Sequence, residues 1–194
     1  MSDETLQQQR KRAKKPMLWI AQASIFMAFA GLTSGFLVSK GSLQDKGLWM
    51  EFALPGEFLT STILIGISSL ALIIAARALK NDNQSLFKSG IIAAFILGIG
   101  FIVFQLLGWQ DLIDRGIFFT GEGSNVSGSW IYAITFFHLL HLAGGIIALL
   151  VTMYKALNGL YSVNNKLGFE LASIFWHFLG AVWLYLYLFL IFVR

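Results

Sequence analysis

Very few side chains of this chain could take part in chemistry, and most of them lie inside long apolar stretches. They are ionisable or amide groups surrounded by aliphatic and aromatic residues: His138, His141, His177, Glu170, Glu57 and Gln105. An ionisable group at membrane depth is costly, so each of them is a functional hypothesis by default. The sequence has no cysteine, which excludes disulfides, thiolate nucleophiles, iron–sulfur clusters and haem attached through Cys.

The spacing of His138 and His141 places both imidazoles on one face of a helix, and Thr135 extends this polar stripe by one turn. A zinc site would need a third protein ligand and partners that orient the ligands, and no carboxylate lies nearby in sequence. A haem held between one of these histidines and His177 is conceivable, although two imidazoles three residues apart serve a single haem poorly. We favour the alternative that they form hydrogen bonds between helices and fix the packing, which lipid alone cannot drive.

Glu170 shares a helix face with Ser173 and His177, near one end of the last apolar stretch. Such a carboxylate could collect protons or pair with a lipid head group. We favour a structural carboxylate bonded to His or Thr on the next helix. Glu57 suits the N-terminal end of its helix through the helix dipole. Trp176 lies deeper than the other tryptophans, so we expect it to pack between helices.

The elements that position these side chains follow from composition. Hydrophobic residues make up 57% of the chain and charged residues 12%, about half the share of a soluble domain, and the mean hydropathy is +0.71. Five apolar stretches exceed the roughly 20 residues that a membrane-spanning helix needs. Lipid offers no partner for backbone groups, so the spans must be helical. We predict an all-α, polytopic membrane protein: a basic cytoplasmic tail at 1–16, then one domain at 17–194 with spans at about 17–38, 55–79, 86–109, 126–154 and 167–193.

The distribution of basic residues predicts the orientation. The side of the membrane that holds the N-terminus has ten Lys and Arg: Arg10, Lys11, Arg12, Lys14, Lys15, Arg77, Lys80, Lys88, Lys155 and Lys166. The other side has four: Lys40, Lys46, Arg115 and Arg194. The positive-inside rule therefore places the N-terminus in the cytoplasm and the C-terminus in the periplasm. Because these charges lie at helix ends and form no stripe, we predict no binding of nucleic acid.

Two segments then resemble one family in their order and spacing. The segment from Thr135 to Gly145, with its His-x-x-His, resembles a helix of subunit III of haem–copper terminal oxidases. The segment from Glu170 to Trp183 resembles the last helix of that family, where a Glu precedes a Trp-His-Phe triplet and a Trp follows the His by six residues. Pro55, Ser61-Thr62 and Ser68-Ser69 in the second span also fit, as does Gln105 in the third.

The resemblance covers nearly everything from Pro55 onward, and the first span completes a short five-helix form. Three positions depart from the family pattern. Gly180 and Gly108 stand where the family usually has acids, and Glu57 matches a family carboxylate only with a shift of a few residues. The polar set that is retained comprises His138, His141, Glu170, Trp176 and His177.

The resemblance implies a non-catalytic core subunit of a proton-pumping oxidase of the aerobic respiratory chain, in a bacterial inner membrane. It implies that this chain has no catalytic, cofactor-binding or metal-ligating residues, and that haems and copper reside in partner subunits. The implied partners are mainly subunit I, then subunit II and other respiratory subunits, with phospholipids held in a V-shaped cleft. The implied role is to support proton uptake and to protect turnover, whether the electron donor is cytochrome c or a quinol.

The residues alone are compatible with two other functions. One is a haem b membrane anchor of a quinone-linked complex, which would use His138 or His141 with His177. The other is a small transporter or channel, although the sequence shows no internal repeat and no pair of broken helices of the transporter type.

Overall fold

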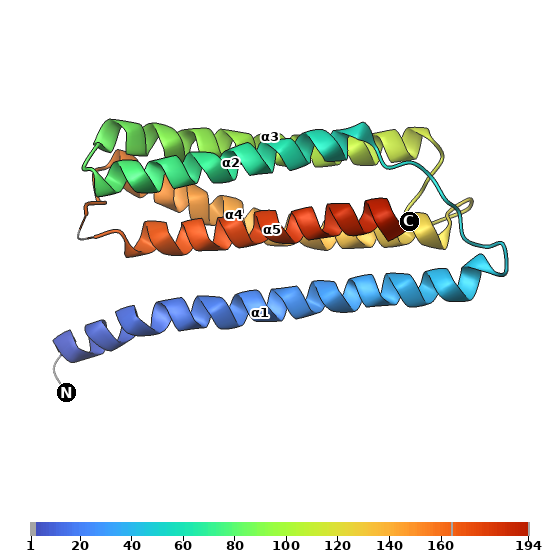
Figure 1. Ribbon diagram of the computed structural model, residues 1–194, viewed down its shortest axis with the longest axis horizontal. Helices are drawn as coiled ribbons and strands as arrows, with labels where there is room; N and C mark the ends of the chain where they lie inside the picture. Colours follow the sequence, from blue (N-terminus) through green and yellow to red (C-terminus); the bar gives the residue numbers. More distant parts are fainter. Residues whose placement is uncertain (1–2, 164, 194) are drawn as a thin grey trace.

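Five long helices make up nearly all of the structure, a computed structural model that describes the backbone of residues 3–163 and 165–193 and the side chains of 13–163 and 165–193. All five are long and apolar enough to cross a membrane. In chain order they are α1 (Asp3–Gln44), α2 (Gly56–Lys80), α3 (Gln84–Asp114), α4 (Val126–Leu157) and α5 (Leu167–Val193) (Figure 1). The predicted all-α, five-span fold is confirmed, and the direction in which the chain crosses the membrane stays a prediction.

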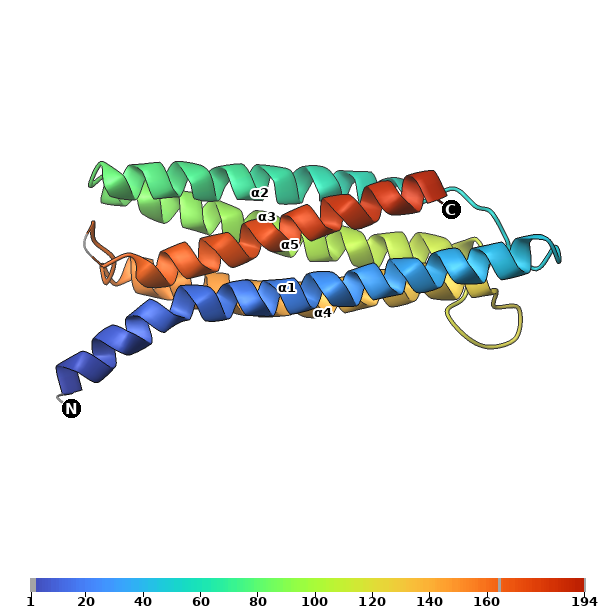
Figure 2. The same cartoon turned by 60° about the horizontal axis from the view of Figure 1, so that its bottom comes forward.

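Helix α1 differs most from its predicted span, because it begins at Asp3 and not near Met17. The basic segment before the apolar run consists largely of Gln, Arg, Lys and Ala, which are strong helix formers, so the helix continues through it. Pro16 lies inside this helix and removes one backbone hydrogen bond. The N-terminal part of α1 runs at an angle to the rest (Figure 2). The side chains of Arg10, Lys11, Arg12 and Arg194, which entered the orientation argument, lie outside the described residues.

Side-chain caps and glycines set several of the other helix ends. The Asn83 side chain accepts a hydrogen bond from the Leu86 amide at 3.1 Å and begins α3, and Asn125 accepts one from the Gly128 amide at 2.7 Å and begins α4. Gly116 and Gly159 follow the ends of α3 and α4 with φ of 77° and 68°, the left-handed conformation that commonly terminates helices. Asn83 and the two glycines lie outside the apolar stretches, so α3 extends past its stretch at both ends and α4 at its C-terminal end.

Helices α2 to α5 form a ring in which each helix packs on its two neighbours, with successive helices antiparallel (Figures 1 and 2). Of the helix pairs in the ring, α2 and α3 make the most extensive contact. A methyl group added at Gly90 would lie 2.9 Å from Cβ of Ala75 and 3.0 Å from the Ala71 carbonyl oxygen, so the two backbones meet where only glycine fits.

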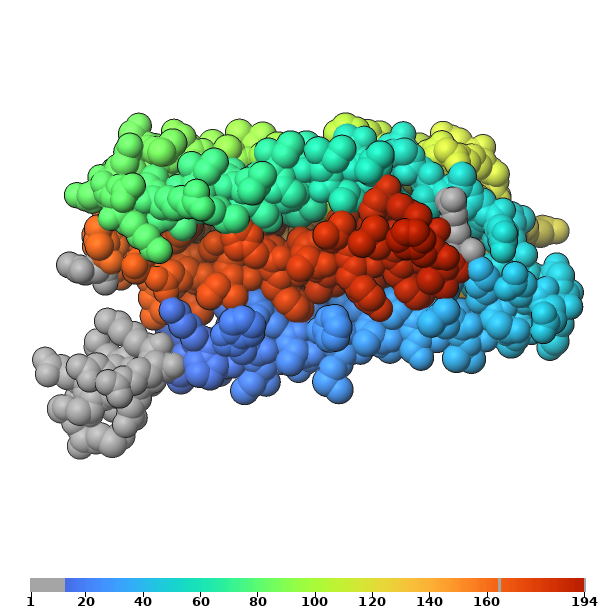
Figure 3. All heavy atoms as spheres, in the orientation of Figure 1, coloured from blue at the N-terminus to red at the C-terminus, as the bar shows by residue number. Residues whose placement is uncertain are grey.

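Helix α1 lies outside this ring. Within the described residues it packs on α4 and α5 and not on α2 or α3. Figure 3 shows it as a ridge that runs beside α5. It is also the least covered span, with 22% of its most apolar window buried against 33% for each of the other four. Helix α1 is therefore the element with the largest surface left for other molecules.

Candidate functional site

The interior of the ring holds a cluster of polar and aromatic side chains. Among the described side chains, no group of three or more His, Cys, Asp or Glu residues lies close enough together to hold a metal ion. Several buried polar side chains in the interior form hydrogen bonds from one helix to another. We call Trp176, Trp183 and the residues that contact their rings or their N–H groups the indole cluster.

Trp176 on α5 contacts three other helices. Its side chain is fully buried, and its Nε1–H donates a hydrogen bond to the Ser68 hydroxyl of α2 at 3.0 Å. The Ser68 hydroxyl donates in turn to the Ala94 carbonyl of α3 at 2.9 Å. Glycines make room for the ring: a methyl group at Gly98 of α3 would lie 2.6 Å from its Cη2, and one at Gly145 of α4 would lie 3.2 Å from its Cε3. Trp176 thus fixes the relative positions of α2, α3, α4 and α5.

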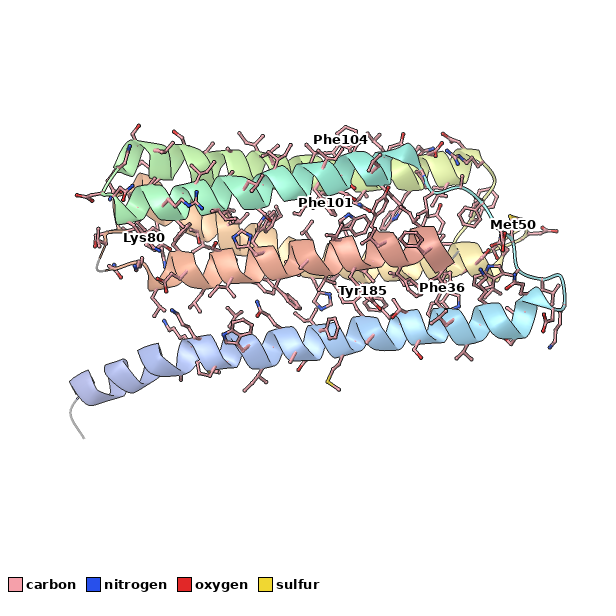
Figure 4. The ribbon with its side chains drawn as sticks, in the orientation of Figure 1. Phe36, Met50, Lys80, Phe101, Phe104 and Tyr185 are labelled. Carbon is pink, nitrogen blue, oxygen red and sulfur yellow. The ribbon has the colours of Figure 1, made fainter. Side chains whose placement is uncertain are left out.

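Trp183 forms the second half of the indole cluster, two turns further along α5. Its Nε1–H donates to the Thr62 hydroxyl of α2 at 2.8 Å. Its ring meets Phe101 of α3 edge-on at 5.2 Å between centroids, and it lies 5.2 Å from the ring of His138 on α4. Figure 4 shows Phe101 pointing from α3 into the bundle. Offset and edge-on aromatic contacts of this kind stabilise a packed interior beyond the area that they bury.

The two histidines of the His-x-x-His pair have different surroundings. His138 is 1% exposed, and its ring lies 6.0 Å from Phe29 and 5.9 Å from Phe101. Neither of its ring nitrogens has a hydrogen-bond partner among the described residues. His141 is partly exposed, and its Nδ1 bonds to the Phe137 carbonyl of its own helix at 2.7 Å. The interhelical hydrogen bonds that we expected for this pair are therefore absent from the described residues, because aromatic rings and the helix backbone occupy the contacts.

His177 is half-buried on α5 and does not join the other two histidines. The α5 side chain that meets His138 is Trp183, and no ring contact links His177 to His138 or His141 among the described residues. Thr135, the third member of the predicted stripe, turns to α3, where its hydroxyl accepts a hydrogen bond from Nε1–H of Trp109 at 3.0 Å.

Glu170 bonds to lysines, not to the His or Thr that the sequence suggested. Its carboxylate lies 2.7 Å from Nζ of Lys15 on α1 and 3.8 Å from Nζ of Lys166. The side chains of Lys15 and Glu170 are 48% and 31% exposed, so solvent screening limits the pair to well under about 1 kcal/mol of stability. Its effect is to join the beginning of α5 to the first part of α1.

Three further polar contacts join α1 to α5 along their length. The Gln22 amide donates to the Ile174 carbonyl at 3.4 Å, the hydroxyls of Thr33 and Tyr185 lie 2.9 Å apart, and Nζ of Lys40 donates to the Val193 carbonyl at 2.8 Å. Tyr185 lies between the two helices (Figure 4). Gln22 and Thr33 are buried, and neither was among the residues predicted from the sequence. Their polarity inside an otherwise apolar span was the signal that could have found them.

Gln105 and Glu57 lie toward the other end of the bundle. The Gln105 amide is buried and donates to the Ser61 hydroxyl at 2.8 Å, which links α3 to α2. Glu57 is half-buried in the first turn of α2, and a methyl group at Gly108 would lie 3.5 Å from its Cβ.

The two glycines at the positions of missing family acids differ in the space around them. At Gly108 a side chain would collide with the ring of Phe58, so this glycine is required by the aromatic packing of α2. At Gly180 an added methyl group would meet Ile65 and Ser69 at 3.5 Å, which is ordinary contact. The fold therefore explains the glycine at 108 and leaves room for a small side chain at 180.

The comparisons with known proteins agree with the two motifs. The family model for cytochrome c oxidase subunit III matches residues 48–193. Among curated proteins, cytochrome c oxidase subunit 3 of Spodoptera frugiperda is 34% identical over 130 residues, which cover 67% of this chain and 84% of that protein. The subunit 3 of Rhipicephalus sanguineus is 34% identical over 171 residues, covering 86% and 63%. That of Synechocystis sp. (strain ATCC 27184 / PCC 6803 / Kazusa) is 30% identical over 175 residues, covering 87% and 70%.

Many of the curated relatives are longer than the region shared with this chain, and the match spans only 47% of the Drosophila yakuba protein, for example. The matched region nevertheless includes α2, α3, α4 and α5 with the whole indole cluster. This multi-pass membrane chain therefore belongs to the cytochrome c oxidase subunit III family.

Proposed function

We propose that the chain is the non-catalytic subunit III of a proton-pumping haem–copper terminal oxidase in a bacterial inner membrane, where it packs chiefly on subunit I. Membership of the family makes it part of an oxidase complex with other subunits. The observation that supports the structural role best is the indole cluster. Its indole N–H groups donate to Ser68 and Thr62 of the neighbouring helix α2, so these four polar groups serve to hold the helices together.

The proposed contribution to the complex is mechanical. Hydrogen bonds and packing hold the helices of the bundle together in its interior, so the bundle provides a rigid surface for the catalytic subunit. It supports proton uptake in that subunit and protects the subunit from inactivation during turnover. Support for this comes from the family resemblance. The glycines at 108 and 180 mean that any help with proton uptake does not involve carboxylates at these two positions.

Purification of the tagged chain in a mild detergent tests the proposal. We expect a large haem-bearing membrane partner to co-purify with the chain, and we expect the same chain expressed alone to show no haem absorbance. The rival haem b anchor predicts the opposite. A stoichiometric bis-imidazole haem on the isolated chain, lost on His177→Ala replacement, would contradict our proposal and favour the anchor.

We further propose that the chain holds an anionic phospholipid between α1, α4 and α5. Two adjoining cavities of about 440 and 330 Å³ share Lys155, Tyr161, Gly168 and Leu171 in their walls. Lys14 and Asn165 line the first, and apolar residues such as Leu18 and Phe175 line the second. Two ammonium groups above an apolar wall suit a phosphate with an attached acyl chain.

Tyr161 contributes a neutral donor to this proposed lipid site. It lies in the connection between α4 and α5, outside the spans. Burial raises the pKa of its phenol above the usual 10.0, although a hydrogen bond with the Thr152 side chain opposes the shift. The phenol therefore remains protonated at neutral pH and is able to donate to a phosphate oxygen.

Native mass spectrometry of the complex tests the lipid proposal. We expect the wild-type chain to retain one or more anionic phospholipids, and the double replacement Lys14→Gln and Lys155→Gln to lose most of them because the phosphate loses its two counter-charges. Lys46→Gln, at the opposite end of the bundle, is the matched control and should change nothing. Equal lipid retention in all three proteins would refute the site.

A further inference from the structure

His141 has one ring nitrogen for which the described residues provide no hydrogen-bond partner. Its Nδ1 lies 2.7 Å from the Phe137 carbonyl oxygen, which only accepts hydrogen bonds. In the neutral imidazole, Nδ1 therefore holds the proton and Nε2 is an acceptor. No hydrogen bond to Nε2 is found among the described residues.

The surroundings of this nitrogen supply no donor. His141 lies near the middle of the 32-residue helix α4, and it lines a cavity of about 210 Å³ between α1 and α4. The other residues of the cavity wall are Ala28, Phe29, Leu32 and Phe137, all apolar. Acyl chains have no donor either, and an unpaired acceptor in hydrocarbon is costly. A hydrogen-bond donor from outside the described residues would remove this cost.

Small residues lie within one helical turn of the cavity-lining residues on both helices. One turn beyond His141, a methyl group at Gly144 would meet nothing within 4 Å, and the same holds for Gly31 on the neighbouring α1. Ala28, which lines the cavity, is exposed. Small residues beside a polar group are typical of contacts between membrane helices, because they let the backbones come close enough for a hydrogen bond.

We propose that the seam between α1 and α4 at His141 docks a transmembrane helix of another subunit, whose Ser or Thr hydroxyl donates to Nε2 of His141. The proposal rests on the proposed function, which supplies the oxidase subunits that could carry such a helix. A hydroxyl is the donor of choice because Ser and Thr are tolerated at mid-membrane depth and commonly bond across helices. The uncovered state of α1 in the isolated chain fits a surface that is completed by assembly.

Three variants of the tagged chain test the docking surface in the assembled complex. His141→Leu keeps an apolar side chain and removes the acceptor, His141→Gln restores an acceptor through its amide oxygen, and Leu140→Ala alters an exposed neighbour that does not line the cavity. The measurement is the fraction of the haem-bearing partner retained during washes with rising detergent. We expect His141→Leu to reduce retention about threefold to tenfold, the range for one hydrogen bond between membrane helices. His141→Gln should recover most of it, and Leu140→Ala should stay within about twofold of wild type.

Retention of the partner by His141→Leu at the wild-type level would overturn the inference, while the proposed function would stand. Failure of the wild-type chain to retain any haem-bearing partner would instead contradict the proposed function. A photo-reactive side chain at Leu32 identifies the occupant directly. A crosslink to another subunit supports the docking helix, whereas a crosslink only to lipid or to a second copy of this chain overturns it. Unchanged thermal unfolding of the isolated His141→Leu chain is required, so that loss of retention reports on docking and not on folding.

Discussion

Replacement of Trp176 by alanine is expected to lower the free energy of unfolding of the isolated chain by about 3–5 kcal/mol. The indole is fully buried, contacts Gly98 and Gly145, and donates to Ser68. Alanine would leave a cavity bordered by four helices and would also remove this hydrogen bond. In a membrane the loss comes mainly from packing contacts, because lipid tails are as apolar as the interior.

The measurement is the SDS fraction at which half of the chain becomes sensitive to a brief pulse of protease. Trp176→Phe should cost less, about 1–2 kcal/mol, because most of the ring volume remains and the Ser68 hydroxyl keeps its bond to Ala94. Trp19→Ala is the matched control, since Trp19 is 62% exposed on α1, and should leave the midpoint almost unchanged. A Trp176→Ala midpoint equal to that of Trp19→Ala would show that the indole cluster does not hold the bundle together.

The second large effect is expected from adding one methyl group at Gly98. The new Cβ of Gly98→Ala would lie 2.6 Å from Cη2 and 2.8 Å from Cζ2 of Trp176. The indole is rigid and tethered through its N–H, so it cannot turn aside as an aliphatic side chain could. We expect a loss of about 1–3 kcal/mol from overpacking, read from the same midpoint.

Gly66→Ala is the control for this substitution, because Gly66 lies in α2 with nothing within 4 Å of an added methyl group. It should not lower the midpoint. The double variant Gly98→Ala with Trp176→Phe provides a stricter check. Phenylalanine lacks the atoms that collide, so the loss of stability in the double variant should be smaller than the sum of the losses in the two single variants. Strict additivity would mean that residues 98 and 176 do not meet as described.

The number and type of the helices could be predicted because hydropathy reports them directly, whereas both ends of α1 and α3 and the C-terminal end of α4 differ from the predicted ones. Helix α1 begins at Asp3 because Lys, Arg and Gln favour a helix in water as well as beside lipid, and an apolar window does not detect this. Asn83 and the glycines after α3 and α4 were visible as capping residues and would have moved the predicted ends outward, whereas Asn125 agrees with the predicted beginning of α4.

The site was harder to predict, because its contacts join residues that are far apart in the chain. The depth of Trp176 could be predicted from its position, but its partners Ser68, Gly98 and Gly145 lie on three other helices, and the sequence does not pair them. The spacing of His138 and His141 predicts one face of α4. It does not reveal that Trp183 and Phe101 enclose the first ring while the second faces the seam with α1.

The central claim, that this chain supports an oxidase without holding any of its redox centres, is tested most directly by stripping the chain from the purified complex with detergent and assaying both fractions. We predict that the stripped complex keeps its haem and copper content and its initial rate of oxygen reduction, and that its activity then decays faster over successive turnovers than that of the intact complex. The fraction that contains this chain should be free of haem and copper. Stoichiometric haem or copper in that fraction, or immediate loss of oxygen reduction with the remaining subunits intact, would contradict the account.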